Sequence, residues 1–380
     1  MSNSRVSFPV FLMVICSMMS ITGGPRANAD NPLVFISSFA SGEEGAIHAY
    51  RLDNHKLTPM RTTTDVEHPF FLALSPDDRF LYSIHAASFG GKAEEQVAAY
   101  RIVDDEGTLE LLNRQSTRGT ASCYLDVDAT GKSVVVANYS TGNIASLPVN
   151  SDGSLGETAT FVQHTGSSVN PQRQNGPNAH CIVVSPDNRF VFAADLGIDK
   201  LMCYRLDAET SKLSPNRQPY VRMPPGAGPR HLTFHPNGEH VYVINELANS
   251  VTHFDYDTEQ GLLFERDTIS TLPEDFDGES YCADLKITPN GRFLYGTNRG
   301  HDSIAAYAID EQGRLTLLEI IASGGKGPQN LAITSDGSLL LCANMPGNNV
   351  ALFRINPADG LITQPVPPLE ITSPSCIMLR

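Results

Sequence analysis

One eight-residue segment recurs seven times along the chain, and this repetition limits the possible fold more than any other feature of the sequence. Each copy alternates apolar and polar residues, as a half-buried β-strand does. Neighbouring copies lie 46 to 57 residues apart, and a fixed period of this length is typical of repeat architectures. The copies read GAIHAYRL (45–52), EQVAAYRI (95–102), GNIASLPV (142–149), DKLMCYRL (199–206), NSVTHFDY (249–256), DSIAAYAI (302–309) and NNVALFRI (348–355).

Turn sequences flank these segments in a constant order. Six of the segments follow a hairpin turn rich in Asp, Asn and Gly, residues that supply the backbone angles of tight turns. A second turn and a Leu-led strand come after the repeated segment. Four antiparallel strands in every 50 or so residues are typical of a β-propeller. We therefore predict an all-β fold, a seven-bladed β-propeller with four antiparallel strands per blade. The six hairpin turns are SPDDR (75–79), DATGK (128–132), SPDNR (185–189), HPNGE (235–239), TPNGR (288–292) and TSDGS (334–338).

The two ends of the chain are predicted to complete one blade together. The first repeat lacks an opening strand, because it begins with LVFISSF (33–39), which matches a second strand. The chain ends in SPSCIMLR (373–380), which matches a first strand such as HPFFLALS (68–75). We expect the C-terminus to supply the innermost strand of the first blade, so that no strand edge is left exposed. Residues 30–380 are accordingly predicted to form a single domain.

The first 29 residues have the composition of an export signal. Arg5 supplies a positive charge, an apolar stretch extends to Ile21, and Ala27-Asn28-Ala29 is a small-x-small cleavage site. Residues 6–25 are uncharged and also long enough for a membrane anchor, but glycines and a proline interrupt them. We predict cleavage near Ala29, which makes the protein exported, periplasmic or extracellular, with no membrane attachment afterwards.

Charge and cysteine content narrow the classes of partner. The formal net charge is -15 and the sequence has no basic run, so nucleic acid is not an expected partner. No CxxC or Cys/His spacing indicates a metal site, and we expect no metal or other cofactor. The even number of cysteines left after cleavage permits disulfides, but their positions in or beside predicted strands favour small buried side chains. These six are Cys123, Cys181, Cys203, Cys282, Cys342 and Cys376.

Polar and charged residues gather at one face of the predicted propeller. In an antiparallel pair the start of the first strand lies beside the end of the second. Within residues 230–256 this pairing brings Arg230, His231, Asn245 and Glu246 to one rim. Corresponding positions in the neighbouring blades place His180, Arg299 and Gln329 at the same rim. Charged groups that converge on a narrow opening often mark a functional site.

The second strand ends in a polar residue in six of the blades. Such side chains commonly satisfy backbone groups at strand ends, which is the interpretation we favour for the asparagines, and they could also contact a ligand at the rim. Both interpretations stay open, and with His231 and Gln329 these residues are candidates for substrate binding. The six residues are His85, Asn138, Asp195, Asn245, Asn298 and Asn344.

From about Pro32 to Arg380 the sequence resembles the seven-bladed propeller lactonases, which include bacterial 6-phosphogluconolactonase and the fungal carboxymuconate cyclase. The resemblance implies that His180, Arg230, Glu246 and Arg299 occupy the active site of that family. Asn178 and Tyr124 stand where relatives often have histidine, which leaves the substrate open. The motifs that carry the resemblance are GPNAHC (176–181), GAGPRHLTFHPNG (226–238), YVINE (242–246), GTNRG (296–300) and GPQNLAI (327–333).

The expected chemistry is metal-independent hydrolysis of a small sugar-type lactone, as in 6-phosphogluconolactonase. Arg230 and Arg299 would hold a carboxylate, a phosphate or a developing oxyanion. Glu246 or His180 would act as general base, and the other would orient water or protonate the leaving alkoxide. The sequence does not decide between these two assignments.

Three alternatives stay open beside this hypothesis. The same arginines with a proton donor could cyclise an unsaturated carboxylic acid of the muconate type. Glu246 and Arg299 could form an ion pair that is purely structural. A non-enzymatic binding propeller of the cell envelope would share the repeats, although it would not need the His, Arg and Glu set. The lack of Trp excludes ordinary WD repeats, and the sequence gives no indication of oligomeric state.

Overall fold

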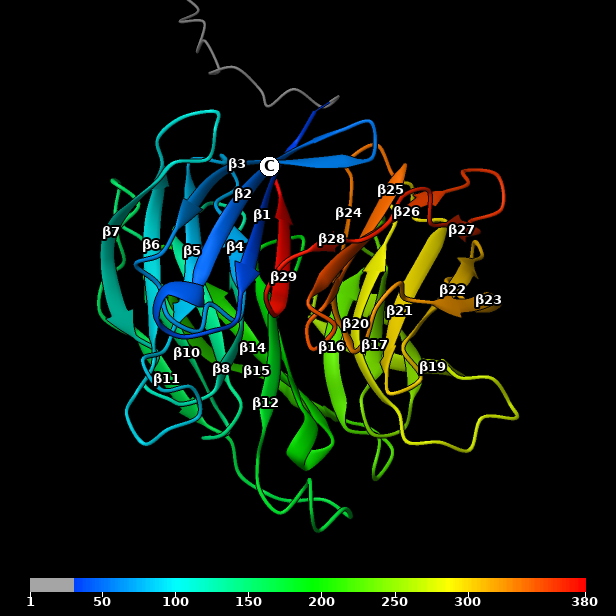
Figure 1. Cartoon of the computed structure of the whole chain (residues 1–380). Coiled ribbons are helices and arrows are strands. Elements are labelled where there is room, and N and C mark those ends of the chain that lie inside the picture. Colours follow the sequence, from blue (N-terminus) through cyan, green and yellow to red (C-terminus); the bar gives the residue numbers. More distant parts are fainter. Residues whose placement is uncertain (1–30) are drawn as a thin grey trace, which may run out of the picture.

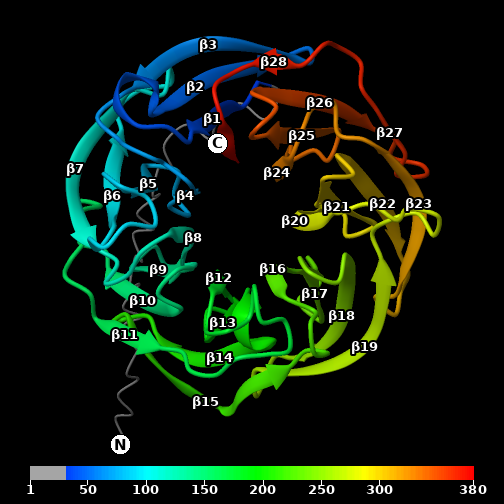
Figure 2. The same ribbon diagram turned by 60° about the horizontal axis from the view of Figure 1, so that its bottom comes forward.

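The computed structural model describes residues 31–380, so the predicted signal segment lies outside the described residues. Within this range, seven antiparallel sheets surround a common axis, as Figure 1 shows from the side and Figure 2 from nearer the axis. The innermost strand of each sheet lies nearest the axis in Figure 2. The predicted seven-bladed propeller is confirmed.

Blades two to six follow the order of the chain, with the first strand innermost. The second and third blades contain β4 (Leu72–Leu74), β5 (Phe80–His85), β6 (Gln96–Ile102), β7 (Leu109–Ser116), β8 (Ser122–Val127), β9 (Ser133–Asn138), β10 (Asn143–Pro148) and β11 (Thr160–Gln163). The fourth and fifth blades contain β12 (Ala179–Val184), β13 (Phe190–Asp195), β14 (Lys200–Asp207), β15 (Lys212–Arg222), β16 (Pro229–Phe234), β17 (His240–Asn245), β18 (Ser250–Asp257) and β19 (Leu262–Ser270). The sixth blade contains β20 (Tyr281–Ile287), β21 (Phe293–Arg299), β22 (Ser303–Ile309) and β23 (Leu315–Ala322).

The seventh blade departs slightly from this scheme. Its outer edge is divided between two short strands that both pair with the third strand. The strands of this blade are β24 (Pro328–Ile333), β25 (Leu339–Asn344), β26 (Asn349–Ile355), β27 (Ile362–Thr363) and β28 (Leu369–Glu370).

The described residues also include two short 3-10 helices outside this blade, η1 (Gly42–Glu44) and η2 (Leu196–Ile198).

The first blade closes the ring in the predicted manner. The C-terminal strand β29 (Pro374–Leu379) pairs antiparallel with β1 (Leu33–Ser38), and the sheet continues through β2 (Ala46–Asp53) and β3 (Lys56–Thr63). Beyond β29, the backbone N–H of Arg380 donates to the carbonyl oxygen of Leu33. The last strand of the chain therefore holds its first strand, and this prediction is confirmed.

Buried tyrosines join three of the blades to the next blade along the chain. The fully buried tyrosines Tyr82, Tyr242 and Tyr295 belong to the second strands of their blades. Their hydroxyls donate to glycine carbonyl oxygens in the following blade, at 3.1, 2.6 and 2.8 Å. The six cysteines are buried and unpaired, as the sequence predicts. Among residues 31–380, no helix is long and apolar enough to cross a lipid bilayer.

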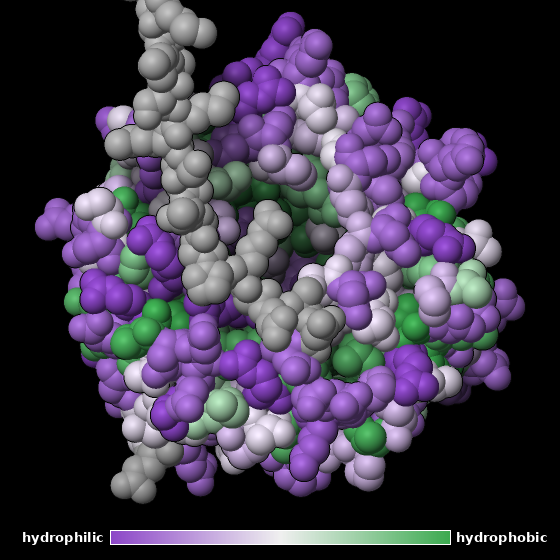
Figure 3. Space-filling model, turned by 90° about the horizontal axis from the view of Figure 1, so that it is seen from above, coloured by the Kyte–Doolittle hydropathy of each residue, from purple (hydrophilic) through white to green (hydrophobic). Residues whose placement is uncertain are grey.

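The two faces of the ring differ in construction. The face formed by the ends of the second strands also receives the long segments between blades. The other face carries the tight hairpin turns, which use left-handed backbone angles such as φ 59° at Asn188 and φ 74° at Gly238. Figure 3 looks onto the face of the C-terminus, which is also the face of the tight turns, and shows a hollow at the axis with apolar residues inside a mostly hydrophilic rim.

Candidate active site

The candidate site is centred on Glu246, which directly follows β17 and is only 4% exposed. Its carboxylate contacts three arginines from three different segments. Arg173 NH2 lies 2.5 Å from Oε1, while Arg230 Nε and Arg299 NH2 lie 3.0 and 2.9 Å from Oε2. The Arg230 contact is a close ion pair without the alignment of a hydrogen bond, because Arg230 Nε has no hydrogen-bond partner. Three cations around one buried carboxylate give the site a net positive charge.

The charge state of this cluster follows from opposing effects. Burial raises the pKa of Glu246, but Arg299, Arg230 and Arg173 outweigh it and hold the pKa below its usual value. Burial and the nearby Arg299 lower the pKa of Arg230 to about 10. Glu246 and Arg230 are therefore both ionised at neutral pH.

A chain of hydrogen bonds holds Arg230 from behind. Its NH1 donates to the carbonyl oxygen of Ala283 and lies 3.0 Å from Nε2 of His231. A guanidinium only donates, so Nε2 of His231 accepts and the proton lies on Nδ1, which donates to Asp284 Oδ1 at 2.8 Å. Burial lowers the pKa of His231 to about 3, in agreement with a neutral ring.

Asp284 anchors the far end of this chain. It is 1% exposed, and its second oxygen accepts hydrogen bonds from Lys286 Nζ, Asn330 Nδ2 and the backbone N–H of Leu331, at 2.9, 2.8 and 2.9 Å. Burial raises the pKa of Asp284, but Lys286 and the hydrogen bonds outweigh it and hold the pKa far below its usual value. Asp284 therefore joins the sixth blade to the fifth and seventh blades around the axis and fixes the position of Arg230.

His180 lies beside the glutamate on the inner strand β12. Its Nε2 is 3.9 Å from Glu246 Oε2, and its ring meets those of Tyr139 and His231 edge to face. Burial and the charge of Arg230 hold the pKa of His180 well below its usual value. The ring is therefore a neutral imidazole next to an ionised carboxylate.

A cavity of about 520 Å³ opens in front of Glu246. Arg299 lies at its wall, where NH2 donates to the carbonyl oxygen of Cys282 at 3.1 Å. The side chains of Arg173 and Arg299 are 32% and 27% exposed, so both cations face a ligand as well as Glu246. Lining residues with polar or aromatic groups are Arg173, Glu246, Glu279, Tyr281, Arg299, Asp302, Lys326 and Gln329.

The structure brings the four predicted catalytic residues together around Glu246. Of these, Glu246 and Arg299 line the cavity, while His180 and Arg230 contact Glu246 from the buried side. Gln329 also lines the cavity, whereas His231 lies behind Arg230. The roles of these residues in catalysis stay predictions.

The residues that end the second strands are placed differently. Asn298 is fully buried, and its amide donates to the carbonyl oxygen of Thr271 and to Ser303 Oγ, at 2.8 and 3.1 Å. Asn138, Asn245 and Asn344 likewise donate to a side chain five residues further on. These bonds close the loop between second and third strands.

The remaining two members of this set also bond within the protein. The Asp195 carboxylate accepts from the backbone N–H of Asn178 at 2.7 Å and lies 2.6 Å from His164 Nδ1, and His85 Nδ1 accepts from the N–H of Glu67 at 3.0 Å. None of the six predicted substrate-binding residues in this set lines the cavity at Glu246. The physical reason is strand alternation, since successive residues point to opposite sides, so Glu246 and Arg299 face the cavity while Asn245 and Asn298 face the blade.

Sequence reasoning missed several residues of the site. Arg173 lies in the long segment between β11 and β12, and Tyr281 is the first residue of β20, after the long segment that follows β19. Asp284 lies at an irregularity in β20, where the register shifts between Cys282 and Leu285. The length of the segments between blades is the sequence signal that could have indicated Arg173 and Tyr281.

Comparisons with known proteins place the chain in context. The family described as "Lactonase, 7-bladed beta-propeller" matches residues 33–379. The chain is 32% identical to the 6-phosphogluconolactonase of Bacillus subtilis (strain 168) over 346 residues, which are 90% of this chain and 97% of that protein. It is 29% identical to the 6-phosphogluconolactonase of Formosa agariphila, over 91% of this chain and 99% of that protein.

Solved structures agree with these sequence comparisons. The periplasmic gluconolactonase of Pseudomonas aeruginosa superposes with a TM-score of 0.86 at 30% identity, covering 92% of this chain and 99% of that one. A putative 6-phosphogluconolactonase from Bacteroides fragilis NCTC 9343 also gives 0.86, at 29% identity, covering 94% of this chain and 100% of that one. The likeness in both comparisons therefore spans the whole ring.

Proposed function

The chain belongs to the seven-bladed β-propeller lactonase family, and from this premise we propose that it hydrolyses a sugar lactone in the cavity beside Glu246. One observation carries the proposal: a buried, ionised carboxylate shares a cavity with two partly exposed arginines. Hydrolysis of a lactone needs a base for water and positive charge for the oxyanion that forms at the carbonyl. This cluster supplies both.

Arg173 and Arg299 are the groups that receive the substrate. Their guanidinium groups face the cavity and offer fixed donors to the lactone carbonyl oxygen, whose negative charge grows during attack. Lys326 at the cavity wall adds a third cation, which would suit a carboxylate or a phosphate on the sugar. The arginines supply the positive charge that the oxyanion requires, so the proposed reaction proceeds without a metal ion.

Glu246 acts as the general base. A carboxylate offers about four lone-pair positions, and Arg173 takes one of them by a hydrogen bond while Arg230 and Arg299 form ion pairs, so room is left for a hydrogen bond from a water molecule. His180 lies on the buried side of Glu246 rather than in the cavity wall. Its neutral ring orients the carboxylate and does not contact the lactone.

The basicity of Glu246 depends on substrate binding in this scheme. In the free protein the arginines keep its pKa low, which makes it a weak base. When Arg173 or Arg299 turns toward the lactone, Glu246 loses part of that stabilisation and its pKa rises. The same movement therefore strengthens the base and polarises the carbonyl.

The reaction consumes one water molecule, and Glu246 carries one proton from this water to the leaving oxygen. Water adds to the carbonyl carbon while its proton passes to Glu246, and the oxyanion is held by the arginines. The intermediate then collapses, the bond from the carbonyl carbon to the ring oxygen breaks, and Glu246 returns the proton to that oxygen. The product is the open hydroxy acid, and Glu246 is again a carboxylate.

We also propose that the protein is exported. The export signal in residues 1–29 supports this location, and so does the structural likeness to a periplasmic gluconolactonase. N-terminal sequencing of the protein purified from its own cells tests the proposal, with Asp30 as the expected first residue. A first residue at Met1 would contradict it.

The test of function is a panel of lactones assayed with the mature chain from Asp30. The panel contains 6-phosphogluconolactone, gluconolactone and a muconolactone, and each rate is corrected for spontaneous hydrolysis. We expect turnover of at least one sugar lactone, unchanged by EDTA and lost in the folded Glu246→Gln and Arg173→Ala variants. No turnover of any lactone would favour a binding propeller, and turnover that persists in both variants would place the chemistry elsewhere.

A further inference from the structure

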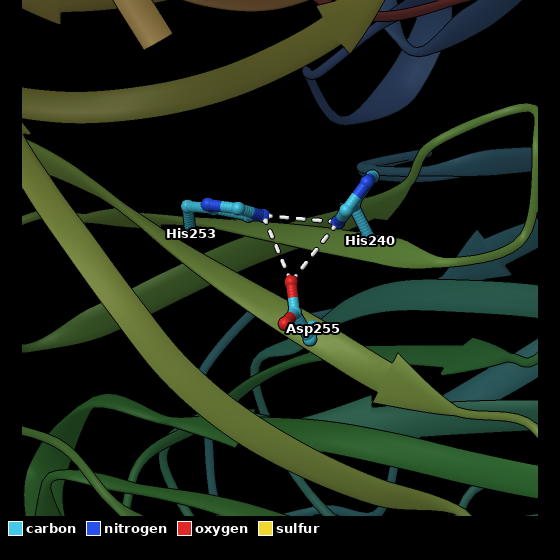
Figure 4. Close-up of side chains that lie close together, drawn as sticks. All are labelled: His240, His253 and Asp255. Atoms are coloured by element: carbon cyan, nitrogen blue, oxygen red, sulfur yellow. Dashed lines mark hydrogen bonds and ion pairs between the residues drawn. The ribbon is translucent and has the colours of Figure 1, made fainter. Parts of the chain in front are cut away.

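A second cluster of polar side chains lies in the fifth blade, on the face of the tight turns. His240 is the first residue of β17, whereas Glu246 follows the other end of that strand, about 20 Å away by the rise of an extended chain. His253 and Asp255 lie on the neighbouring strand β18. The three side chains point toward one another in Figure 4. The proposed lactonase mechanism uses none of them.

The other blades show that this cluster departs from the repeat. His240 pairs directly with Asp255, and His253 pairs with Tyr242, so the matching positions in each blade can be compared. Where His240 and Asp255 pair, the other blades have Leu33 and Arg51, Phe80 and Arg101, Ser133 and Pro148, Phe190 and Arg205, Phe293 and Ala308, or Leu339 and Arg354. At the position of His253 they have Ala49, Ala99, Ser146, Cys203, Ala306 or Leu352.

Nothing in the fold requires histidine or aspartate at these positions. In the second blade, Phe80 covers Gly153 of the next blade and Ala99 leaves room beside it. In the fifth blade the corresponding glycine, Gly313, lies against His240 and His253 instead. The fifth blade thus replaces an apolar contact between blades with three potential metal ligands at once.

The three ligand atoms form a nearly regular triangle. His240 Nδ1 lies 3.1 Å from His253 Nε2 and 3.2 Å from Asp255 Oδ1, and His253 Nε2 lies 3.7 Å from Asp255 Oδ1. A circle through these atoms has a radius of about 1.95 Å, so an ion about 2.1 Å from each atom would sit roughly 0.8 Å out of their plane. These are the dimensions of three ligands at the base of a tetrahedral zinc site.

Hydrogen bonding alone satisfies this cluster poorly. Nδ1 of His240 faces two acceptors, and it can give its single proton to only one of them at a time. A cation between the three atoms would use the lone pairs of both rings and of the carboxylate together.

Neighbouring residues hold the ligands in place. The Tyr242 ring stacks on His253 with centroids 5.2 Å apart, and its hydroxyl is fixed by Gly313 O. Arg266 Nε and NH2 hold Asp255 Oδ2 at 2.6 and 2.5 Å, which leaves Oδ1 directed at the histidines. Such outer contacts commonly orient metal ligands.

We propose that His240, His253 and Asp255 form a binding site for a divalent ion of the zinc type. Two nitrogens and one carboxylate oxygen favour Zn²⁺ over Mg²⁺ or Ca²⁺, which prefer oxygen ligands alone. The fourth position opens into a cavity of about 400 Å³ whose wall includes Arg266, Arg314 and Asp267. The two arginines select an anionic fourth ligand, such as hydroxide or a carboxylate, and so balance the charge.

The test measures Zn²⁺ binding to the mature chain after removal of metal with EDTA. Calorimetric titration with ZnCl₂ is expected to give one site per chain with a micromolar or tighter Kd. Two variants each remove one ligand and should weaken binding at least about 100-fold. His253→Ala introduces the alanine found at this position in the first, second and sixth blades, and Asp255→Asn changes a partly exposed ligand. The variant His48→Ala removes a histidine of the first blade that lies within hydrogen-bonding distance of the hydroxyls of Ser38 and Thr62, and it should bind as the parent does.

Cobalt gives a second readout that does not depend on activity. Co²⁺ bound in this site is expected to show the strong visible absorption of four-coordinate cobalt, which Zn²⁺ abolishes by displacement. Binding that is absent in the parent protein, or equal in the parent and both site variants, would overturn the proposal. Binding of Ca²⁺ in preference to Zn²⁺ would overturn it as well.

Discussion

Two buried glutamates on the same face of the ring show how differently one fold can use a carboxylate. Glu95 in the second blade is 2% exposed and accepts hydrogen bonds from the backbone N–H groups of Gly90, Ala121 and Ser122, at 2.8, 2.8 and 2.6 Å. Glu246 in the fifth blade is 4% exposed and is surrounded by three arginines. Burial is the same at both positions, and the partners differ.

The difference distinguishes a carboxylate that stabilises the fold from one that can act on a ligand. Backbone amides cannot move away from Glu95 without unfolding the loops that carry them. The partly exposed side chains of Arg173 and Arg299 can leave Glu246 for a ligand while the fold stays intact. A carboxylate held by partly exposed side-chain cations at a cavity is therefore suited to catalysis, whereas a carboxylate held by backbone amides stabilises the blade.

The sharpest test of this comparison replaces each glutamate by glutamine. Glu246→Gln removes the general base, and we expect kcat to fall about 10² to 10⁴-fold. The variant should keep the far-ultraviolet circular dichroism of the parent protein. Turnover is measured on whichever sugar lactone the panel identifies.

Glu95→Gln is the matched control and should behave in the opposite way. Its amide offers one oxygen where the carboxylate offered two, so a backbone N–H at Ala121 or Ser122 loses its acceptor. We expect a loss of about 1 to 3 kcal/mol in the free energy of unfolding, measured by urea denaturation, and an unchanged kcat. If Glu246→Gln lost stability and kept its turnover, the two glutamates would have the same role, and the ion pairs of Glu246 would be structural.

The second prediction concerns Arg299, one of the two partly exposed arginines at the cavity. Arg299→Ala removes a donor to the oxyanion and one partner of Glu246, and we expect kcat/KM to fall on the order of 10²-fold. Arg292→Ala is the control, because Arg292 lies at the turn face and donates to the carbonyl oxygens of Pro357 and Ala358. An equal loss in both variants would mean that charge far from the cavity matters as much as Arg299.

The third prediction extends the comparison to adjacent residues of one strand. Asn298→Ala leaves the carbonyl oxygen of Thr271 and the hydroxyl of Ser303 without their donor, so we expect a loss of about 1 to 3 kcal/mol in unfolding free energy. KM for the lactone should change far less than in Arg299→Ala. A large rise in KM with unchanged stability would restore the substrate-binding role that the sequence suggested for Asn298.

The fold could be predicted because its determinants are periodic. The repeated third strands and the Asp, Asn and Gly turns fixed the blade boundaries, and the missing first strand at residue 33 identified the C-terminal strand that closes the ring. The charged residues Arg230, Glu246 and Arg299 could be grouped because each stands at a fixed place in the blade pattern.

The rest of the site could not be predicted because the repeated strand pattern determines neither the segments between blades nor the direction in which each side chain points. Arg173 belongs to a long segment between blades that no other repeat contains, so nothing in the pattern indicated its position. The polar residues at strand ends were ambiguous, since the repeat places Asn298 and Arg299 one residue apart and only the local backbone decides which side chain faces the cavity. His240, His253 and Asp255 follow the repeat in position, but their convergence requires the pairing of two strands.

The last prediction concerns pH and has the smallest expected effect. The folded pKa values of both Glu246 and His180 are lowered, so the carboxylate and the neutral imidazole both persist as pH rises, and both are lost only when pH falls below their lowered pKa values. We therefore expect kcat/KM, which reports the free protein, to change less than about threefold between pH 5.5 and 7.5 after correction for spontaneous hydrolysis, with no step near 6.5, where an unperturbed histidine titrates. The folded protein must be checked at each pH, because neutral buried His180 and His231 bind protons more weakly than they do in the unfolded chain, and stability therefore falls as pH drops below about 6.5. A step near pH 6.5 that disappears in His180→Gln would assign the base to His180. Glu246 would then have a structural role, as Glu95 has.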